Sequence, residues 1–319
     1  MIHYIQIHAK DKFVQEIYRA IKKDFGFLAE PFTLHTPSPP LLAGAWILIR
    51  EGVLVGDAPR HIKEAVAVAV SQTNQCPYCV DAHTIMLHAD GQHELAQAVL
   101  NEEEDDIIQW AKNPQQPPPK LPYLPEIATT IVAFHYINRM VHVFLDDSPL
   151  LNLPATKRVQ RRLVGLGLRR AVRKNKQIGI SLQLLSGVGT LPPAFCWAKN
   201  NLHLSEALIR WSTAIEQAGI QVLSANARRI VRGYLANWKG DAMPMGVQWL
   251  EEMLKNVPEA ILPEVRFLLL VSLASHRLTP QEVAQFRDYH PSDNELVVAT
   301  SWAGYMAACR IGELIHLSA

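Results

Sequence analysis

The chain has 319 residues, of which 49% are hydrophobic and 19% are charged, a globular composition able to bury a core in one or two domains. The formal net charge of +1 gives no electrostatic reason to expect a nucleic-acid partner. No basic, apolar signal peptide opens the chain, no uncharged apolar run reaches about 18 residues, and the four cysteines do not form a secreted disulfide framework. We expect a cytoplasmic protein with no membrane partner.

Helical patterns fill the first hundred residues. Apolar residues at four-residue spacing between Phe13 and Phe25 predict a helix that ends before the prolines of 31–40. The apolar stretch 41–55 predicts a second helix, and a third carries Glu64 and runs toward Ser71. The next helix begins near Cys76 and ends at Asp90-Gly91, where the glycine is a typical helix terminator.

The remaining pattern is also helical. Residues 113–125 contain six prolines and predict a loop, and 127–145 reads as a strong helix. Apolar helices are expected within 204–238, at 267–274 and at 295–315, and Thr279 opens another helix with a capping box. No alternating strand pattern appears, so the predicted fold class is all-α.

A basic segment separates the two halves. Between 157 and 176 the chain has nine lysines and arginines and no acid. Such a stretch could form an amphipathic helix for a membrane surface or an acidic partner, but Gly165 and Gly167 argue against a continuous helix. We expect a linker or crossing segment at 149–195, between a helical repeat at 1–148 and a second repeat at 196–319.

Two thiols and a histidine gather in the helix that begins near Cys76. Cys79 and His83 are four residues apart and therefore share a helix face, and Pro77 suits the first helical turn. This places Cys76 at the cap and Cys79 in the first turn, where the unpaired N–H groups and the helix dipole favour a thiolate. A neighbouring His83 can take the thiol proton. The pattern is that of a reactive dithiol.

Three other interpretations of the Cys-x-x-Cys pair remain open. The cysteines could be buried apolar residues. A zinc site would need a fourth ligand, and no second Cys or His pair lies at metal spacing. The tetrapeptide Cys-Pro-Tyr-Cys also occurs in glutaredoxins, whose fold needs strands and a later cis-proline loop. Strand-like stretches are few, and the chain has no Thr-Val-Pro.

The two halves of the chain show a degenerate repeat. Glu64 and Glu264 each open an apolar helix, and twelve residues further on lie Cys76 and His276. Three more residues lead to Cys79 and Thr279, so the second copy has no thiol at the key positions. We interpret the second half as packing scaffold and expect the chemistry in the first half.

At Glu64, Cys76, Cys79 and His83 the sequence resembles the alkylhydroperoxidase D/carboxymuconolactone decarboxylase family. The shared motif is Glu, eleven residues, Cys-x-x-Cys, three residues, His. The similarity to the peroxidase-like branch covers residues 45–145 and weakens over 200–319. It implies an all-helical bundle, two tandem helical repeats in this chain and a homo-oligomer. The decarboxylase members lack the Cys pair, so their activity is not the one implied.

The resemblance implies a thiol peroxidase without a cofactor or metal. Cys79 would attack the peroxide, Cys76 would resolve the sulfenic acid as a disulfide, and His83 and Glu64 would relay protons. The partners would be a peroxide and a thiol or dithiol reductant. A non-enzymatic redox switch or scaffold is the alternative. We expect no function for Cys196 and Cys309, and we leave His135 and Arg139 out of the site.

Overall fold

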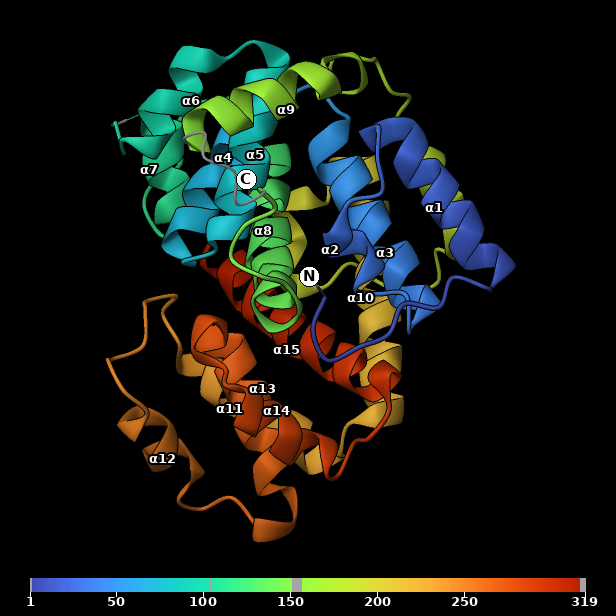
Figure 1. Ribbon diagram of the computed structural model, residues 1–319. Coiled ribbons are helices and arrows are strands. Elements are labelled where there is room, and N and C mark those ends of the chain that lie inside the picture. Colours follow the sequence, from blue (N-terminus) through green and yellow to red (C-terminus); the bar gives the residue numbers. More distant parts are fainter. Residues whose placement is uncertain (1, 104, 151–156, 316–319) are drawn as a thin grey trace.

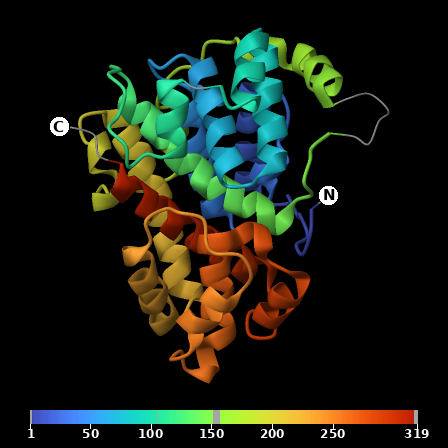
Figure 2. The ribbon, with the colours of Figure 1, turned by 90° about the vertical axis from the view of Figure 1, so that its left-hand side faces the viewer.

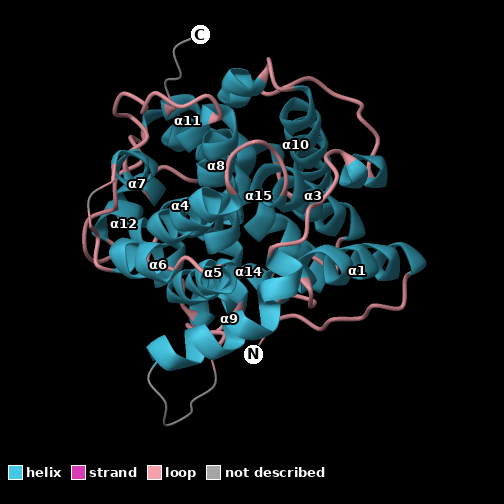
Figure 3. Ribbon diagram, turned by 90° about the horizontal axis from the view of Figure 1, so that it is seen from above, coloured by secondary structure: helices cyan, strands magenta, loops and turns pink. Residues whose placement is uncertain are grey.

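The computed structural model describes residues 2–103, 105–150 and 157–315, and in these residues the secondary structure is helical apart from one isolated bridge between Ile2 and Leu145. Figure 3 accordingly shows helices joined by loops. The first half contains α1 (Lys12–Phe25), α2 (Glu30–Thr33), α3 (Pro39–Ile49), the π-helix η1 (Arg50–Leu54), α4 (Arg60–Thr73), α5 (Pro77–Asp90), α6 (His93–Leu100), α7 (Asp106–Lys112) and α8 (Leu124–Phe144). The predicted all-α class is confirmed.

The second half is helical as well. After α9 (Lys157–Val172) come two short 3₁₀ helices, η2 (Ile180–Leu184) and η3 (Pro193–Ala198), and then α10 (Leu202–Val222), α11 (Ala225–Asn237), α12 (Gln248–Leu254), η4 (Glu259–Ile261), α13 (Leu262–Ala274), η5 (Ser275–Arg277), α14 (Pro280–Arg287) and α15 (Asp293–Leu314). Figures 1 and 2 show α11–α14 gathered at one end of the molecule, with α15 running between them and the N-terminal helices. Thr279 and Glu282 form the predicted capping box of α14.

Two long helices organise the core. α8 has 21 residues and α15 has 22, and most side chains of both are buried. They pack against each other, α4 packs on α8, and α13 packs on α15. Apolar side chains on nearly every face of α8 explain this central position, since such a helix must be surrounded. The arrangement is compatible with tandem repeats, whose boundaries stay a prediction.

The residues that were predicted to begin and end α5 lie at the two ends of the helix. Cys76 occupies the N-cap and Pro77 the first helical position, while Gly91 ends the helix in the left-handed conformation at φ 87°. The tight turn before the helix places Gln75 at φ 57°, and the Cys76 N–H donates to the Ser71 carbonyl at 2.8 Å. α4 and α5 thereby form a packed antiparallel pair.

The predicted break in the basic segment is wrong. Residues Lys157–Val172 form one continuous helix, α9, which packs along α5. Gly165 makes the packing possible, because a Cβ there would lie 2.9 Å from the Ile85 carbonyl oxygen. The close approach compensates for the low helix propensity of glycine. Arg161 and Lys157 form ion pairs with the buried Asp81 of α5, so part of the basic charge is neutralised within the chain.

The described helices bear on two classes of protein, membrane-spanning proteins and glutaredoxins. Within the described residues, no helix has the length and apolar character needed to cross a membrane. The absence of a sheet from the described ranges makes the glutaredoxin interpretation wrong, because that fold is built around βαβ units.

Candidate active site

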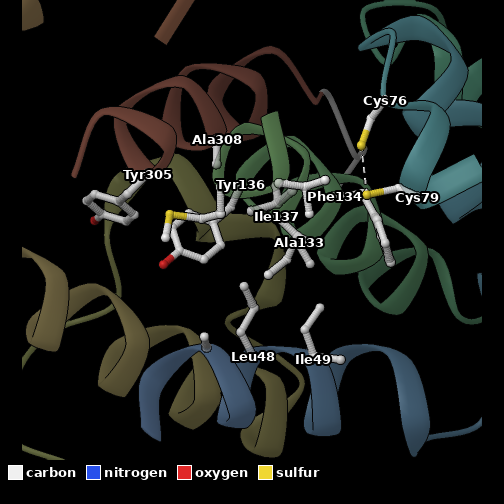
Figure 4. Close-up of a cluster of buried hydrophobic side chains, with 14 of the residues drawn as sticks. Leu48, Ile49, Cys76, Cys79, Ala133, Phe134, Tyr136, Ile137, Tyr305 and Ala308 are labelled. Carbon is white, nitrogen blue, oxygen red and sulfur yellow. Dashed lines mark hydrogen bonds between the residues drawn. The ribbon is translucent and has the colours of Figure 1, made fainter. Parts of the chain in front are cut away.

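The two thiols lie in contact at the start of α5. The sulfur atoms of Cys76 and Cys79 are 2.8 Å apart, both cysteines are free, and their exposed fractions are 1% and 2%. Figure 4 shows the pair at the edge of a buried cluster to which α3, α8 and α15 contribute side chains, with Phe134 of α8 next to Cys79. The helix geometry predicted from the spacing therefore brings both sulfurs within bonding reach.

The environments of the sulfurs differ. Burial raises the pKa of Cys76 well above the usual thiol range, and the adjacent Cys79 sulfur raises it further. Cys76 therefore stays protonated and donates its S–H toward Cys79. Cys79 is the third residue of α5, and its backbone N–H donates a hydrogen bond to the Cys76 sulfur, which opposes the rise in the pKa of Cys76. The pair thus consists of a thiol that burial keeps protonated and a second sulfur that accepts its hydrogen.

His83 and Glu64 form a second pair, which joins α5 to α4. The Glu64 Oε2 atom lies 2.6 Å from His83 Nδ1, and Arg60 Nε donates to Glu64 Oε1 at 2.8 Å. Burial pushes the Glu64 pKa upward, but the charges of Arg60 and His83 outweigh it and hold the pKa at about 2. Glu64 is an ionised acceptor at neutral pH, so His83 Nδ1 carries a hydrogen and Nε2 is left to exchange a proton.

Cys79 and His83 face an apolar cavity of about 200 Å³. Cys79 and His83 both line it, while the other walls are predominantly apolar. The Phe134 ring stands edge-on to the His83 ring at 4.4 Å between centroids, which holds the imidazole in place. Val164 and Leu168 of α9 form part of the wall. A small apolar molecule entering this cavity would reach Cys79 and His83 together.

Beneath Cys76, an amide network connects α4 to α8. Asn138 Nδ2 donates to Ser71 Oγ at 3.0 Å, and Asn74 Nδ2 donates to Asn138 Oδ1 at 2.9 Å. A hydrogen bond from Asn138 opposes the rise in the pKa of Cys76. These contacts fix the turn that carries the first thiol.

Three groups of this site were not anticipated from the sequence. Arg60 precedes Glu64 by one helical turn, which is a readable ion-pair signal. Phe134 and Asn138 come from the distant helix α8, and nothing local links them to the Cys-x-x-Cys motif. Their placement depends on the packing of α4 on α8.

Other residues considered from the sequence lie elsewhere. Arg139 is buried and donates to the carbonyls of Ser272 and His135 at 2.9 and 2.6 Å. Neither Arg139 nor His135 lines the apolar cavity. Glu264, the counterpart of Glu64, instead accepts from the backbone and hydroxyl of Ser224 at 2.8 and 2.7 Å.

Cys196 and Cys309 are distant in the sequence from the Cys76/Cys79 pair, and their surroundings differ from those of the pair. Cys196 is exposed on η3, and burial raises the pKa of Cys309 on α15 above its ordinary value. Where the structure describes the chain, no group of three or more His, Cys, Asp or Glu side chains is arranged to hold a metal ion.

The described chain is an all-α protein with two buried cysteines in contact beside a Glu–His pair, and comparisons with known proteins show its family. The model of the carboxymuconolactone decarboxylase family matches residues 40–102. The chain is 36% identical to the alkyl hydroperoxide reductase Rv2159c of Mycobacterium tuberculosis, over 96% of this chain and 92% of that protein. The chain belongs to the carboxymuconolactone decarboxylase family. No solved structure matches it significantly.

Proposed function

We propose that this protein is a thiol-dependent peroxidase that reduces peroxides through the Cys76/Cys79 dithiol. One observation carries the proposal: Cys79 touches the Cys76 sulfur at 2.8 Å and lines, together with His83, a mainly apolar cavity. The name of the mycobacterial relative, an alkyl hydroperoxide reductase, supports a peroxide-reducing oxidoreductase. The composition of the cavity wall favours an alkyl-bearing peroxide.

In the first step, the Cys79 thiolate attacks one peroxide oxygen of ROOH and the O–O bond breaks. Cys79 becomes a sulfenic acid, and the departing alkoxide takes a proton to leave as the alcohol ROH. His83 moves protons through Nε2, while the ionised Glu64 holds Nδ1–H and fixes the orientation of the imidazole. The high pKa of Cys76 keeps a second proton next to the reacting sulfur.

In the second step, the Cys76 sulfur attacks the sulfenic sulfur of Cys79. A disulfide forms, the hydroxyl leaves, and the Cys76 proton completes a water molecule. The net reaction converts ROOH and two thiols into ROH, water and the disulfide. A thiol or dithiol reductant then restores both thiols, and no cofactor enters the balance.

The role of each thiol is tested with single serine variants and a dimedone label read by mass spectrometry. Cys76→Ser should accumulate a labelled sulfenic acid on Cys79, because no neighbouring thiol can condense with it. Cys79→Ser should show no label on Cys76. His83→Ala should slow labelling by roughly ten- to a thousandfold, the range for loss of one general base.

The opposite labelling pattern would reverse the roles. Absence of label in both wild type and Cys76→Ser would remove the peroxidase proposal and leave a redox switch or scaffold as the interpretation. We also propose that the protein forms a homo-oligomer, because the family resemblance implies one. Analytical ultracentrifugation would measure the oligomeric state.

A further inference from the structure

The two sulfurs, although in contact, belong to different hollows of the protein. Cys79 lines the apolar cavity, whereas Cys76 lines a separate cleft of about 300 Å³. Of the described residues that line the two hollows, only Tyr78 borders both. We call the second hollow the Cys76 cleft and define its polar wall by His142, Asp146, Asp147 and His276.

Both halves of the chain build the Cys76 cleft. His142 comes from the end of α8 and the two aspartates follow it, whereas His276 belongs to η5 in the second half. His142 is fixed between the halves: Nε2 lies 3.0 Å from the Gln75 carbonyl oxygen and Nδ1 lies 2.7 Å from Ser275 Oγ. The second half, which lacks the Cys-x-x-Cys pair, thus contributes a wall next to Cys76.

The Cys76 cleft has a polar wall, whereas the cavity at Cys79 is apolar. Asp146 and Asp147 are exposed, and Asp146 pairs with His3 at 2.7 Å. Burial lowers the pKa of His142 to about 4, so this imidazole is neutral at pH 7. Arg277 lies behind the wall and donates to His276 Nε2 at 3.2 Å. A polar molecule finds hydrogen-bonding partners here that the apolar cavity does not offer.

We propose that the Cys76 cleft is the entrance for a small polar dithiol reductant, which reaches the disulfide at Cys76 while the peroxide reaches Cys79 from the apolar cavity. This inference rests on the proposed function. Thiol–disulfide exchange needs a thiolate, and placing a thiolate in an apolar cavity is costly without partners. The polar cleft avoids that cost.

Reduction of the Cys76–Cys79 disulfide takes two successive thiol–disulfide exchanges. The reductant thiol loses its proton to water in the cleft, its sulfur bonds to Cys76 Sγ, and the Cys76–Cys79 bond breaks with its electron pair on Cys79. The second thiol of the reductant then attacks the reductant sulfur of this mixed disulfide. The reductant leaves as a disulfide, Cys76 recovers a proton, and Cys79 is left as the thiolate that the peroxide step uses.

Variants that block each hollow separately test the two entrances. His276→Trp and Asp147→Trp add bulk at two points of the cleft wall. Val164→Trp is the matched variant for the cavity, since Val164 lines it and is 46% exposed. For each protein, the disulfide is made with diamide and its reduction by dithiothreitol is timed. The oxidation of the reduced protein by cumene hydroperoxide is timed separately.

At least one cleft variant should slow reduction by about tenfold or more while peroxide oxidation stays within about twofold, and Val164→Trp should do the reverse. Equal melting temperatures of the variants would show that folding is intact. Reduction within twofold in both cleft variants, or slowed reduction in Val164→Trp, overturns the separate entrance. Because diamide makes the disulfide without peroxide, a wild type that peroxide fails to oxidise would count against the proposed function alone.

Discussion

Replacing Glu64 by Gln tests the electrostatic core of the site. Glu64 is 1% exposed and its carboxylate accepts from Arg60 and lies 2.6 Å from His83. Its pKa is lowered from 4.5 to about 2, which corresponds to roughly 3 kcal/mol of folding free energy at about 1.4 kcal/mol for each pKa unit. We expect Glu64→Gln to lower the free energy of unfolding at pH 7 by about 2–4 kcal/mol, since it also leaves Arg60 without a charged partner.

The sign of the pH dependence follows from the lowered pKa. The Glu64 contribution is fully present above the unfolded-state pKa of 4.5 and is lost as the pH falls toward the folded-state pKa of about 2. The stability gap between wild type and Glu64→Gln should therefore be constant between pH 7 and 5 and shrink between pH 4.5 and 3.

Urea unfolding at pH 7, 5, 4 and 3 measures this gap. Glu94→Gln, at an exposed glutamate of α6, is the matched control and should show little change at any pH. A gap that is absent at pH 7, or that keeps its full size down to pH 3, would refute the assignment of Glu64 as a buried, ion-paired carboxylate.

Three further outcomes follow from the structure. Peroxide treatment should convert Cys76 and Cys79 into an intramolecular disulfide, seen as the loss of two hydrogens by mass spectrometry; two persistently free thiols would contradict the 2.8 Å contact. Replacing Cys196 and Cys309 together by Ala should leave peroxide consumption within about twofold, although removing the Cys309 sulfur can lower stability; a tenfold loss in a folded protein would give one of them a role. Gly165→Val should lower the melting temperature by several degrees, because its side chain meets the backbone of α5, and an unchanged melting temperature would show that α9 can move away freely.

The part of the site encoded by local sequence was predictable. Proline at the first helical position and glycine after the last one mark the ends of α5, and helical spacing alone places Cys76, Cys79 and His83 on one side. The family motif added Glu64, whose distance from His83 no helix spacing gives, because the two belong to different helices. The all-α class followed from the same local periodicity.

The features of the fold and the site that the sequence did not predict depend on tertiary packing. The sequence predicts a break in α9 because helix propensity includes the cost of Gly165. It does not include the close contact with α5 that this glycine permits. Phe134 and Asn138 are separated from the motif by some fifty residues, and no local pattern brings them to it. The separate hollow at Cys76 needs His276 from the second half, so a sequence without a known fold gives no signal for it.

The contact between the two sulfurs also bears on irreversible damage. A sulfenic acid that meets a second peroxide becomes a sulfinic acid, which most thiol enzymes cannot reverse. With Cys76 already touching Cys79, condensation is an intramolecular event whose partner has a very high effective concentration. A second peroxide would have to compete by diffusion for the same sulfur. The geometry therefore favours survival at peroxide concentrations that would inactivate an enzyme whose resolving cysteine must first move into place.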